Sequence, residues 1–188
     1  FPVPAMRHLR EQVAQAHPEL AHDYTAQRKI SLSHALRLGG DSETLMEPAF
    51  KAFYHARNTV DFYADCLPAL ERLSSRYPLV ALTNGNADLE QTGIARFFTG
   101  CISAKTVGTA KPHAAIFEAA RIHLGFNAEQ ILHIGDDPWL DVEGAQAAGF
   151  RSAWINRTQA RWPAELKQAD ITVTDLSQLA DLIDEVPA

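Results

Sequence analysis

The apolar residues in the first third of the chain are spaced three or four positions apart, as in amphipathic helices, from Pro4 to about Arg57. His17-Pro18 and Gly39-Gly40-Asp41-Ser42 interrupt this spacing, because the residue before a proline avoids the helical region and glycine commonly ends a helix. The pattern therefore predicts helices throughout this part. Its recurring apolar positions are Leu9, Val13, Ala16, Ile30, Ala35, Leu38, Met46, Phe50, Phe53 and Tyr54.

From Asp61 onward, short continuous apolar runs alternate with stretches of helical spacing. Parallel strands that are buried on both faces have continuous apolar runs, so this alternation predicts a parallel sheet covered by helices. We therefore expect an α/β fold with a doubly wound, Rossmann-like parallel sheet over residues 61–188, preceded by a helical domain over residues 1–60. The expected strands span 79–83, 101–103, 131–135, 152–155 and 171–173, and the expected helices span 65–75, 87–91, 112–124, 142–148 and 176–183.

Composition narrows the possible functions. A net charge of -6, from 17 basic and 23 acidic residues without a basic stripe, argues against nucleic acid as a partner. Cys66 and Cys101 lie far apart and lack metal-ligand spacing, so free, buried thiols in a reducing compartment are expected. No apolar stretch approaches the ~20 residues of a membrane-spanning helix, and the sequence does not open with a signal-peptide pattern. Together these features predict a cytoplasmic protein with no membrane partner.

Residues suited to phosphate binding follow the strand expected at 79–83. Thr83-Asn84-Gly85 ends this strand and leads toward an expected helix, where a hydroxyl and backbone N–H groups can hold an anion. An ordinary strand-to-helix turn has the same composition. Farther along, Lys111 precedes Pro112, which is predicted to occupy the first position of a helix. The lysine cation could neutralise a phosphoryl group or hold a carboxylate, or it could simply be solvated.

The most specific run follows the strand expected at 131–135. Asp136 and Asp137 come directly after Gly135, and Asp141 follows four positions later. Carboxylates gathered at the carboxyl end of a strand suit Mg2+, a hard cation that uses one or two protein carboxylates together with water and substrate phosphate. Helix capping alone could explain Asp137 and Asp141. Two adjacent aspartates exceed what capping needs, so this run predicts a magnesium site.

Together and in this order, the three runs resemble the haloacid dehalogenase-like hydrolase superfamily, especially its phosphatases with an inserted, all-helical cap domain. The resemblance covers essentially the whole chain, and residues 1–60 are similar to such a cap. On a finer scale, residues 82–87 and 133–137, together with the cap that contains Arg57, are similar to the bacterial branch that includes flavin-pathway sugar-phosphate phosphatases. The resemblance implies a Mg2+-dependent phosphatase that acts on a small phosphorylated metabolite through an aspartyl-phosphate, as a monomer or a homodimer.

The same resemblance assigns roles to the residues of these runs. Asp136 is expected to bind Mg2+, while Asp137 and Asp141 are expected to lie around that ligand, with Asp141 tied to Lys111. The phosphoryl oxygens are expected to be held by Thr83, Lys111 and the backbone of Asn84 and Gly85. Thr83 and Lys111 are thus the catalytic residues expected in this sequence, and Lys111 would also orient the nucleophile.

The nucleophile itself has no counterpart in the sequence. The superfamily's first motif is a strand that delivers a nucleophilic aspartate and a second aspartate as general acid/base. The resemblance places this strand between the strands expected at 79–83 and 131–135. We therefore expect the natural chain to carry roughly 40 further residues upstream.

Two alternatives stay open. A haloacid dehalogenase uses the same fold and a carboxylate nucleophile, but it attacks carbon and needs no metal. A non-catalytic protein would bind a metal or a partner in its acidic cleft. Among the other polar residues, His133 is interpreted as a core histidine, and His55 and Arg57 as members of a solvated helix face.

Overall fold

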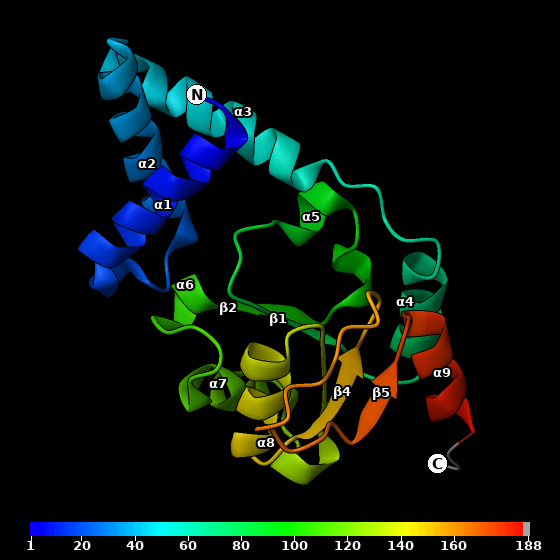
Figure 1. Cartoon of the computed structure of the whole chain (residues 1–188). Coiled ribbons are helices and arrows are strands. Elements are labelled where there is room, and N and C mark those ends of the chain that lie inside the picture. The colour runs from blue at the N-terminus through cyan, green and yellow to red at the C-terminus, as the bar shows by residue number, and fades with distance from the viewer. Residues whose placement is uncertain (186–188) are drawn as a thin grey trace.

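The helices α1, α2 and α3 form the N-terminal part of the computed structural model, which describes residues 1–185 (Figure 1). Their bounds are Val3–Ala16, Tyr24–Gly39 and Met46–Asn58, with short turns of 3-10 helix at Pro18–Leu20 and Glu43–Leu45. Both predicted interruptions are confirmed, because α1 ends before His17 and Pro18, and Gly40 ends α2 in the left-handed region, with φ of 75°. No helix within this described range is both long and apolar enough to cross a membrane.

The rest of the chain has the predicted α/β fold. The strands are β1, Val80–Thr83; β2, Gly100–Ser103; β3, Leu132–Gly135; β4, Arg151–Ile155; and β5, Ile171–Val173. Each pairing between them is parallel. The longer helices of this part are α4, Cys66–Ser74; α7, Ala114–Leu124; and α9, Leu176–Asp184. Helix α7 packs on β1 and β2, while α9 packs on β5 and on α4 (Figure 1). Residues 186–188, the end of the predicted α/β part, lie outside the described residues.

The strands form two separate sheets. β1 pairs with β2 in one sheet, and β4 lies between β3 and β5 in the other. Within residues 1–185, β1 and β3 therefore each keep one edge without a partner strand. The ends of these two strands carry the Thr83 and Asp136 runs, while Lys111 follows β2 and helix α6, Ala104–Val107, so the arrangement of the two sheets determines how the three runs meet.

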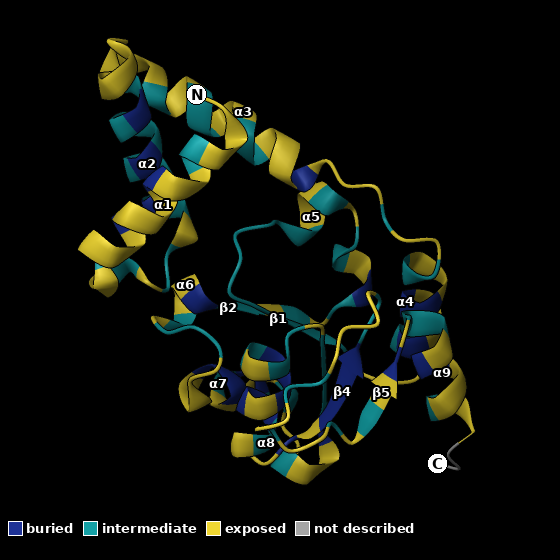
Figure 2. Ribbon diagram, viewed as in Figure 1, coloured by how far each residue is buried: buried dark blue, intermediate teal, exposed yellow. Residues whose placement is uncertain are grey.

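A buried apolar cluster holds the helices against this sheet system (Figure 2). Phe117 of α7 is completely buried, and its ring packs edge-on against the rings of Phe150 and His133, with centroids 5.8 and 5.3 Å apart. Such edge-to-face contacts are favourable for aromatic rings and define their relative orientation. The other buried members of the cluster are Ala104, Ile116, Ile131 and Ala145.

Three local expectations were wrong. Pro112 does not begin α7, because His113 is the N-cap, accepting a hydrogen bond from the backbone of Ala115, and the helix starts at Ala114. The helix expected at 142–148 is shorter, since a π-helical turn over Pro138–Glu143 precedes α8, Gly144–Ala147. The helix expected at 87–91 begins later, as α5 over Leu89–Thr92, because Asp88 caps it. The short helix α6, Ala104–Val107, was not expected.

Gly144, the first residue of α8, packs closely against Phe117 of α7 and against Pro112. A Cβ atom at this position would lie 2.9 Å from the Phe117 ring and 3.0 Å from Cα of Pro112. Gly144→Ala should therefore lower the free energy of unfolding by about 1–3 kcal/mol, the usual cost of overpacking. Urea denaturation measures this effect. Ala147→Ser, at an exposed site of the same helix, is the control and should change stability by about 0.5 kcal/mol or less; equal effects of the two variants would contradict the packing argument.

Candidate active site

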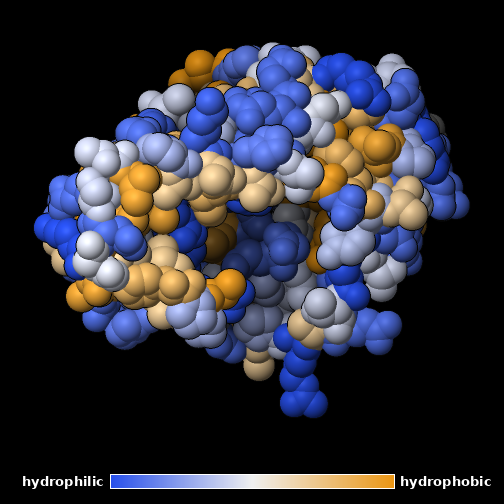
Figure 3. All heavy atoms as spheres, turned by 90° about the horizontal axis from the view of Figure 1, so that it is seen from above, coloured by the Kyte–Doolittle hydropathy of each residue, from blue (hydrophilic) through white to orange (hydrophobic). Residues whose placement is uncertain are grey.

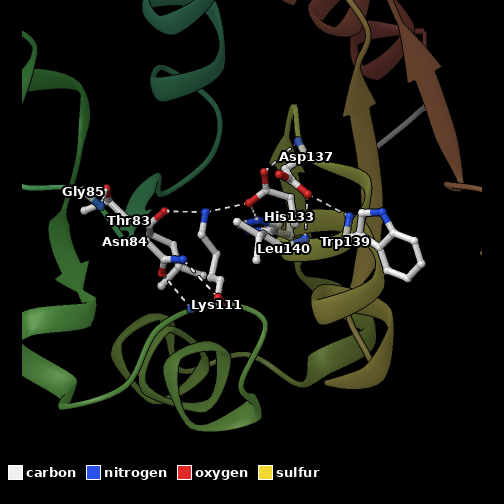
Figure 4. A network of polar contacts seen from close by, with 10 residues as sticks. Thr83, Asn84, Gly85, Lys111, His133, Asp137, Trp139 and Leu140 are labelled. Atoms are coloured by element: carbon white, nitrogen blue, oxygen red, sulfur yellow. Dashed lines mark hydrogen bonds and ion pairs between the residues drawn. The ribbon is translucent and has the colours of Figure 1, made fainter. Parts of the chain in front are cut away.

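The turn after β1 is joined to the segment that carries Lys111. The amide of Asn84 makes a pair of hydrogen bonds to the backbone of Lys111, donating from Nδ2 to the carbonyl at 3.0 Å and accepting at Oδ1 from the N–H at 2.7 Å (Figure 4). Within the turn, the N–H of Gly85 donates to Oγ1 of Thr83 at 2.9 Å. The Asn84 side chain therefore sets the distance between the Thr83 turn and the lysine.

The ammonium group of Lys111 joins the two sheets. Its Nζ donates to the carbonyl of Leu82 in β1 at 3.1 Å and to Oδ1 of Asp141 at 2.6 Å (Figure 4). The side chains of Lys111 and Asp141 are only 12% and 6% exposed. Charge-assisted hydrogen bonds of this kind are strong when water is excluded, so the pair rigidly connects the end of β1 to the segment after β3.

Asp141 collects several further donors. Nε2 of His133 lies 3.0 Å from the same Oδ1 that accepts from Lys111, and the backbone N–H of Asp137 donates to Oδ2 at 3.1 Å. Burial by itself would raise the pKa of Asp141, but the hydrogen bond from His133 and the positive charge of Lys111 outweigh it and hold this pKa well below its ordinary value. Asp141 is therefore a permanent anion at neutral pH.

Gly135 makes room for this anion. A Cβ atom on Gly135 would lie 2.2 Å from Cγ of Asp141, a distance that no side chain tolerates. Because side chains alternate along a strand, His133 and Gly135 face the same side of β3, and both meet Asp141. That alternation was the signal in the sequence that could have brought His133 into the site. The side chain of His133 is 9% exposed, so it lies largely inside the protein as expected, but its partner is the carboxylate of Asp141.

The two adjacent aspartates after β3, Asp136 and Asp137, differ in their contacts. Asp137 caps the π-helical turn, since its Oδ1 accepts from the backbone N–H groups of Trp139 and Leu140, both at 2.9 Å (Figure 4). Asp136 is exposed, and only its backbone carbonyl is engaged, by Nε1 of Trp154 at 2.9 Å. The Asp136 carboxylate thus has no protein partner among the described residues.

The carboxylates after β3 could supply only some of the ligands that Mg2+ needs. Residues 1–185 contain no group of three or more His, Cys, Asp or Glu side chains arranged to hold a metal. Mg2+ keeps several waters and completes its shell with one or two carboxylates and phosphate oxygens. The free carboxylate of Asp136 suits that mode of binding, whereas the Asp141 carboxylate is saturated by Lys111, His133 and the Asp137 backbone.

A cavity of about 560 Å3 lies beside the Thr83 turn. Figure 3 shows a hollow in the face of the molecule seen from above. The N-terminal helical part, through residues 22–25 and Tyr54, and the α/β part both contribute residues to the wall of the cavity. Its lining includes His22, Tyr24, Tyr54, Thr83, Gly85 and Lys105.

Several sequence-based interpretations need correction at this point. Gly85 does not lie at a helix N-terminus, because α5 starts only at Leu89, and its N–H is bonded to Thr83. Arg57 is exposed, as expected of a solvated helix face, and its Nη2 also lies 3.6 Å from the position of a Cβ on Gly85. Both cysteines are free, as expected, but neither is buried, since Cys101 is exposed and Cys66 is half-buried. The expected pairing of Asp141 with Lys111 is present.

Comparison with known proteins agrees with this geometry. Residues 4–149 match the family described as haloacid dehalogenase-like hydrolase. The chain belongs to this family. It is 34% identical over 154 residues to the 5-amino-6-(5-phospho-D-ribitylamino)uracil phosphatase YigB of Escherichia coli, covering 80% of this chain and 65% of that protein. It is 32% identical to (S)-2-haloacid dehalogenase 2 of a Pseudomonas species, covering 64% of this chain and 55% of that protein.

The fold of this haloacid dehalogenase-like chain is also similar to that of a solved structure. The 2-haloacid dehalogenase from Pseudomonas syringae superposes with a TM-score of 0.87 at 32% sequence identity, covering 98% of this chain and 81% of that one. The chain spans less than two thirds of the length of the two curated relatives above, 65% and 55%. Relatives with both phosphatase and dehalogenase names share its family, so the family alone does not identify the reaction.

Asp141→Asn tests the charge balance of the site. Without the carboxylate, the Lys111 cation is left buried and unpaired, so the free energy of unfolding at pH 7 should fall by about 3–5 kcal/mol. Because the folded pKa of Asp141 lies below its ordinary value of 3.8, its stabilising effect is complete above that value and is lost as the pH falls toward the folded pKa. The stability difference between wild type and variant should therefore shrink below about pH 4.

Urea unfolding between neutral and acid pH measures this difference. Asp61→Asn, at an exposed position, is the matched control and should show neither the loss nor its pH dependence. A difference for Asp141→Asn that stays constant into the acid range would contradict the assignment of the stabilisation to this anion.

Proposed function

We propose that the protein is a Mg2+-dependent phosphatase that hydrolyses a small organic phosphate ester through an aspartyl-phosphate. The observation that carries this proposal is the bridge made by Lys111, whose Nζ contacts both Leu82, next to the Thr83 turn, and Asp141, beyond Asp136. The bridge connects the strand that ends in the Thr83 turn to the segment that contains Asp136. Phosphoryl transfer needs such a convergence, since its catalysis consists mainly of positioning and charge stabilisation.

We further propose that the natural chain supplies the nucleophilic aspartate from a strand upstream of Phe1, placed between β1 and β3. The open edges of these two strands support this position, since apolar parallel strands are normally paired on both sides. A nucleophile at the carboxyl end of that strand would face the Nζ of Lys111. The ammonium group would then orient the attacking carboxylate, and Asp141 would keep the ammonium group in place.

The reaction then follows in two steps. The carboxylate attacks phosphorus, the bond from phosphorus to the ester oxygen breaks, and the departing oxygen takes up a proton. Water next attacks phosphorus and releases phosphate from the aspartate. The hydroxyl of Thr83, whose oxygen already accepts from Gly85, still has its hydrogen to donate to a phosphoryl oxygen. When bound at Asp136, Mg2+ would offset the negative charge of those oxygens.

The cavity beside the turn would hold the part of the substrate that leaves. Its volume of about 560 Å3 suits a small phosphorylated metabolite. Because the cap contributes Tyr24 and Tyr54 to its wall, the cap would exclude water and select the leaving group. We retain a cytoplasmic location and a monomeric or homodimeric state as parts of this proposal.

A haloacid dehalogenase is the second candidate. The likeness to the Pseudomonas syringae dehalogenase favours it, with a TM-score of 0.87. Such an enzyme would use the same carboxylate nucleophile on carbon and would need no metal. The free carboxylate of Asp136 favours the phosphatase, because a metal-independent displacement at carbon has no use for it.

Assays of the protein expressed from the natural start of its gene distinguish these two functions. We expect hydrolysis of p-nitrophenyl phosphate that needs Mg2+ and is abolished by a chelator, with no halide released from 2-chloropropionate. Asp136→Asn should lower the phosphatase activity by ~100-fold or more, because it removes a metal ligand, whereas Asp61→Asn should leave it unchanged. Halide release that persists with the chelator, without phosphatase activity, would establish the second candidate instead.

A further inference from the structure

The end of the cap helix α3 is fastened to the α/β part by one buried amide. Asn58 is only 5% exposed. Its Oδ1 accepts from the backbone N–H of Asp88 at 2.8 Å, and its Nδ2 donates to the carbonyl of Tyr54 at 2.9 Å and to Oε1 of Gln91 at 3.4 Å. A buried amide with partners on both sides has a fixed position. The last turn of α3 is therefore held next to the segment that follows the Thr83 turn.

This attachment places Arg57, the residue before Asn58, beside the phosphate-binding turn. Nη2 of Arg57 lies 3.6 Å from where a Cβ of Gly85 would be, and Oγ1 of Thr83 lies 3.3 Å from the same point. Arg57 does not line the cavity itself, but Gly85 and Thr83 do. The guanidinium group thus stands where an anion held by the turn would meet it.

The positive charge of Arg57 is not paired with a carboxylate among the described residues. The guanidinium groups of Arg72, Arg121 and Arg157 pair with carboxylates, whereas Arg57 has no carboxylate partner within residues 1–185. The other cations near the turn are balanced, since Lys111 pairs with Asp141 at 2.6 Å and Lys105 lies 3.5 Å from Asp23. A phosphate ester that enters this site brings up to two negative charges, and Lys111 with Asp141 supplies no net charge against them.

We propose that Arg57 is a substrate-binding residue which the cap supplies to the phosphoryl group. The planar guanidinium can donate two parallel hydrogen bonds to phosphoryl oxygens, which an ammonium group cannot reproduce. Asn58 is its positioning residue. This inference rests on the proposed function for its ligand, a phosphoryl oxyanion, and it adds that the cap takes part in binding the phosphoryl group as well as the leaving group.

Binding of inorganic phosphate, measured by titration calorimetry on the protein expressed from its natural start, tests this role without requiring turnover. Arg57→Ala should weaken phosphate binding about 10- to 100-fold, the usual effect of losing hydrogen bonds to a charged group. Arg57→Lys should fall between Arg57→Ala and the wild type, because it keeps the charge and loses the fork. Arg57 is exposed, so its variants should keep the thermal stability of the wild type.

Arg37→Ala is the matched control, because it removes the same charge from the cap at a guanidinium that lies 3.4 Å from Glu43. It should bind phosphate as the wild type does. An Arg57→Ala variant that binds phosphate within twofold of the wild type would overturn the inference, as would a wild type that does not bind phosphate. An Arg57→Ala variant that loses the wild type's binding of propionate but keeps its binding of phosphate would also overturn the inference, since Arg57 would then recognise a carboxylate.

The test of Arg57 can fail or succeed independently of the test of the proposed phosphatase activity. If Arg57→Ala loses phosphate affinity while the wild type shows no phosphatase activity, the oxyanion site stands and the proposed reaction fails. If phosphatase activity is present and Arg57→Ala leaves both its KM and the phosphate affinity unchanged, the reaction stands and this role of Arg57 is excluded.

Discussion

The carboxylate of Asp141 is the group on which the site depends. It is buried, and a buried anion is tolerated only when donors surround it. Lys111, His133 and the Asp137 backbone supply these donors from different segments of the chain. The anion in turn holds the ammonium group of Lys111 in position, and Lys111 connects β1 to the segment after β3. Two sheets that share no strand pairing are thereby held in one relative position at their carboxyl ends.

This arrangement needs close packing around the carboxylate. Gly135 leaves the space that Asp141 occupies, and Gly144 lets α8 approach Phe117 and Pro112. The π-helical turn Pro138–Glu143, capped by Asp137, carries Asp141 back toward β3. The adjacent carboxylate of Asp136 is left exposed by the same turn. One aspartate therefore organises the turn, a second neutralises the lysine, and the third stays available to a ligand.

The cap is tied to this site by polar contacts. Asn58 joins the end of α3 to the backbone of Asp88, and Lys105 faces Asp23 on the other side of the cavity. Contacts of this kind keep the cap near the Thr83 turn while leaving a cavity between the two parts. A substrate in that cavity would contact groups from both parts.

Local sequence determined the elements of this protein. Periodic apolar spacing and continuous apolar runs correctly predicted the cap helices and the parallel strands, because secondary structure follows from which residues can be buried together. The sequence also singled out Thr83, Lys111 and Asp136, since their residue types follow strands or precede helices. The resemblance also led us to expect the pairing of Lys111 with Asp141, but the other contacts of these residues were decided only by the tertiary structure. The bonds from Asn84 to Lys111, from His133 to Asp141 and from Asn58 to Asp88, and the place of Arg57 beside Gly85, join segments that the chain brings together by folding. No local pattern encodes such pairs, because a side chain's partner depends on packing between elements and not on its neighbours in sequence.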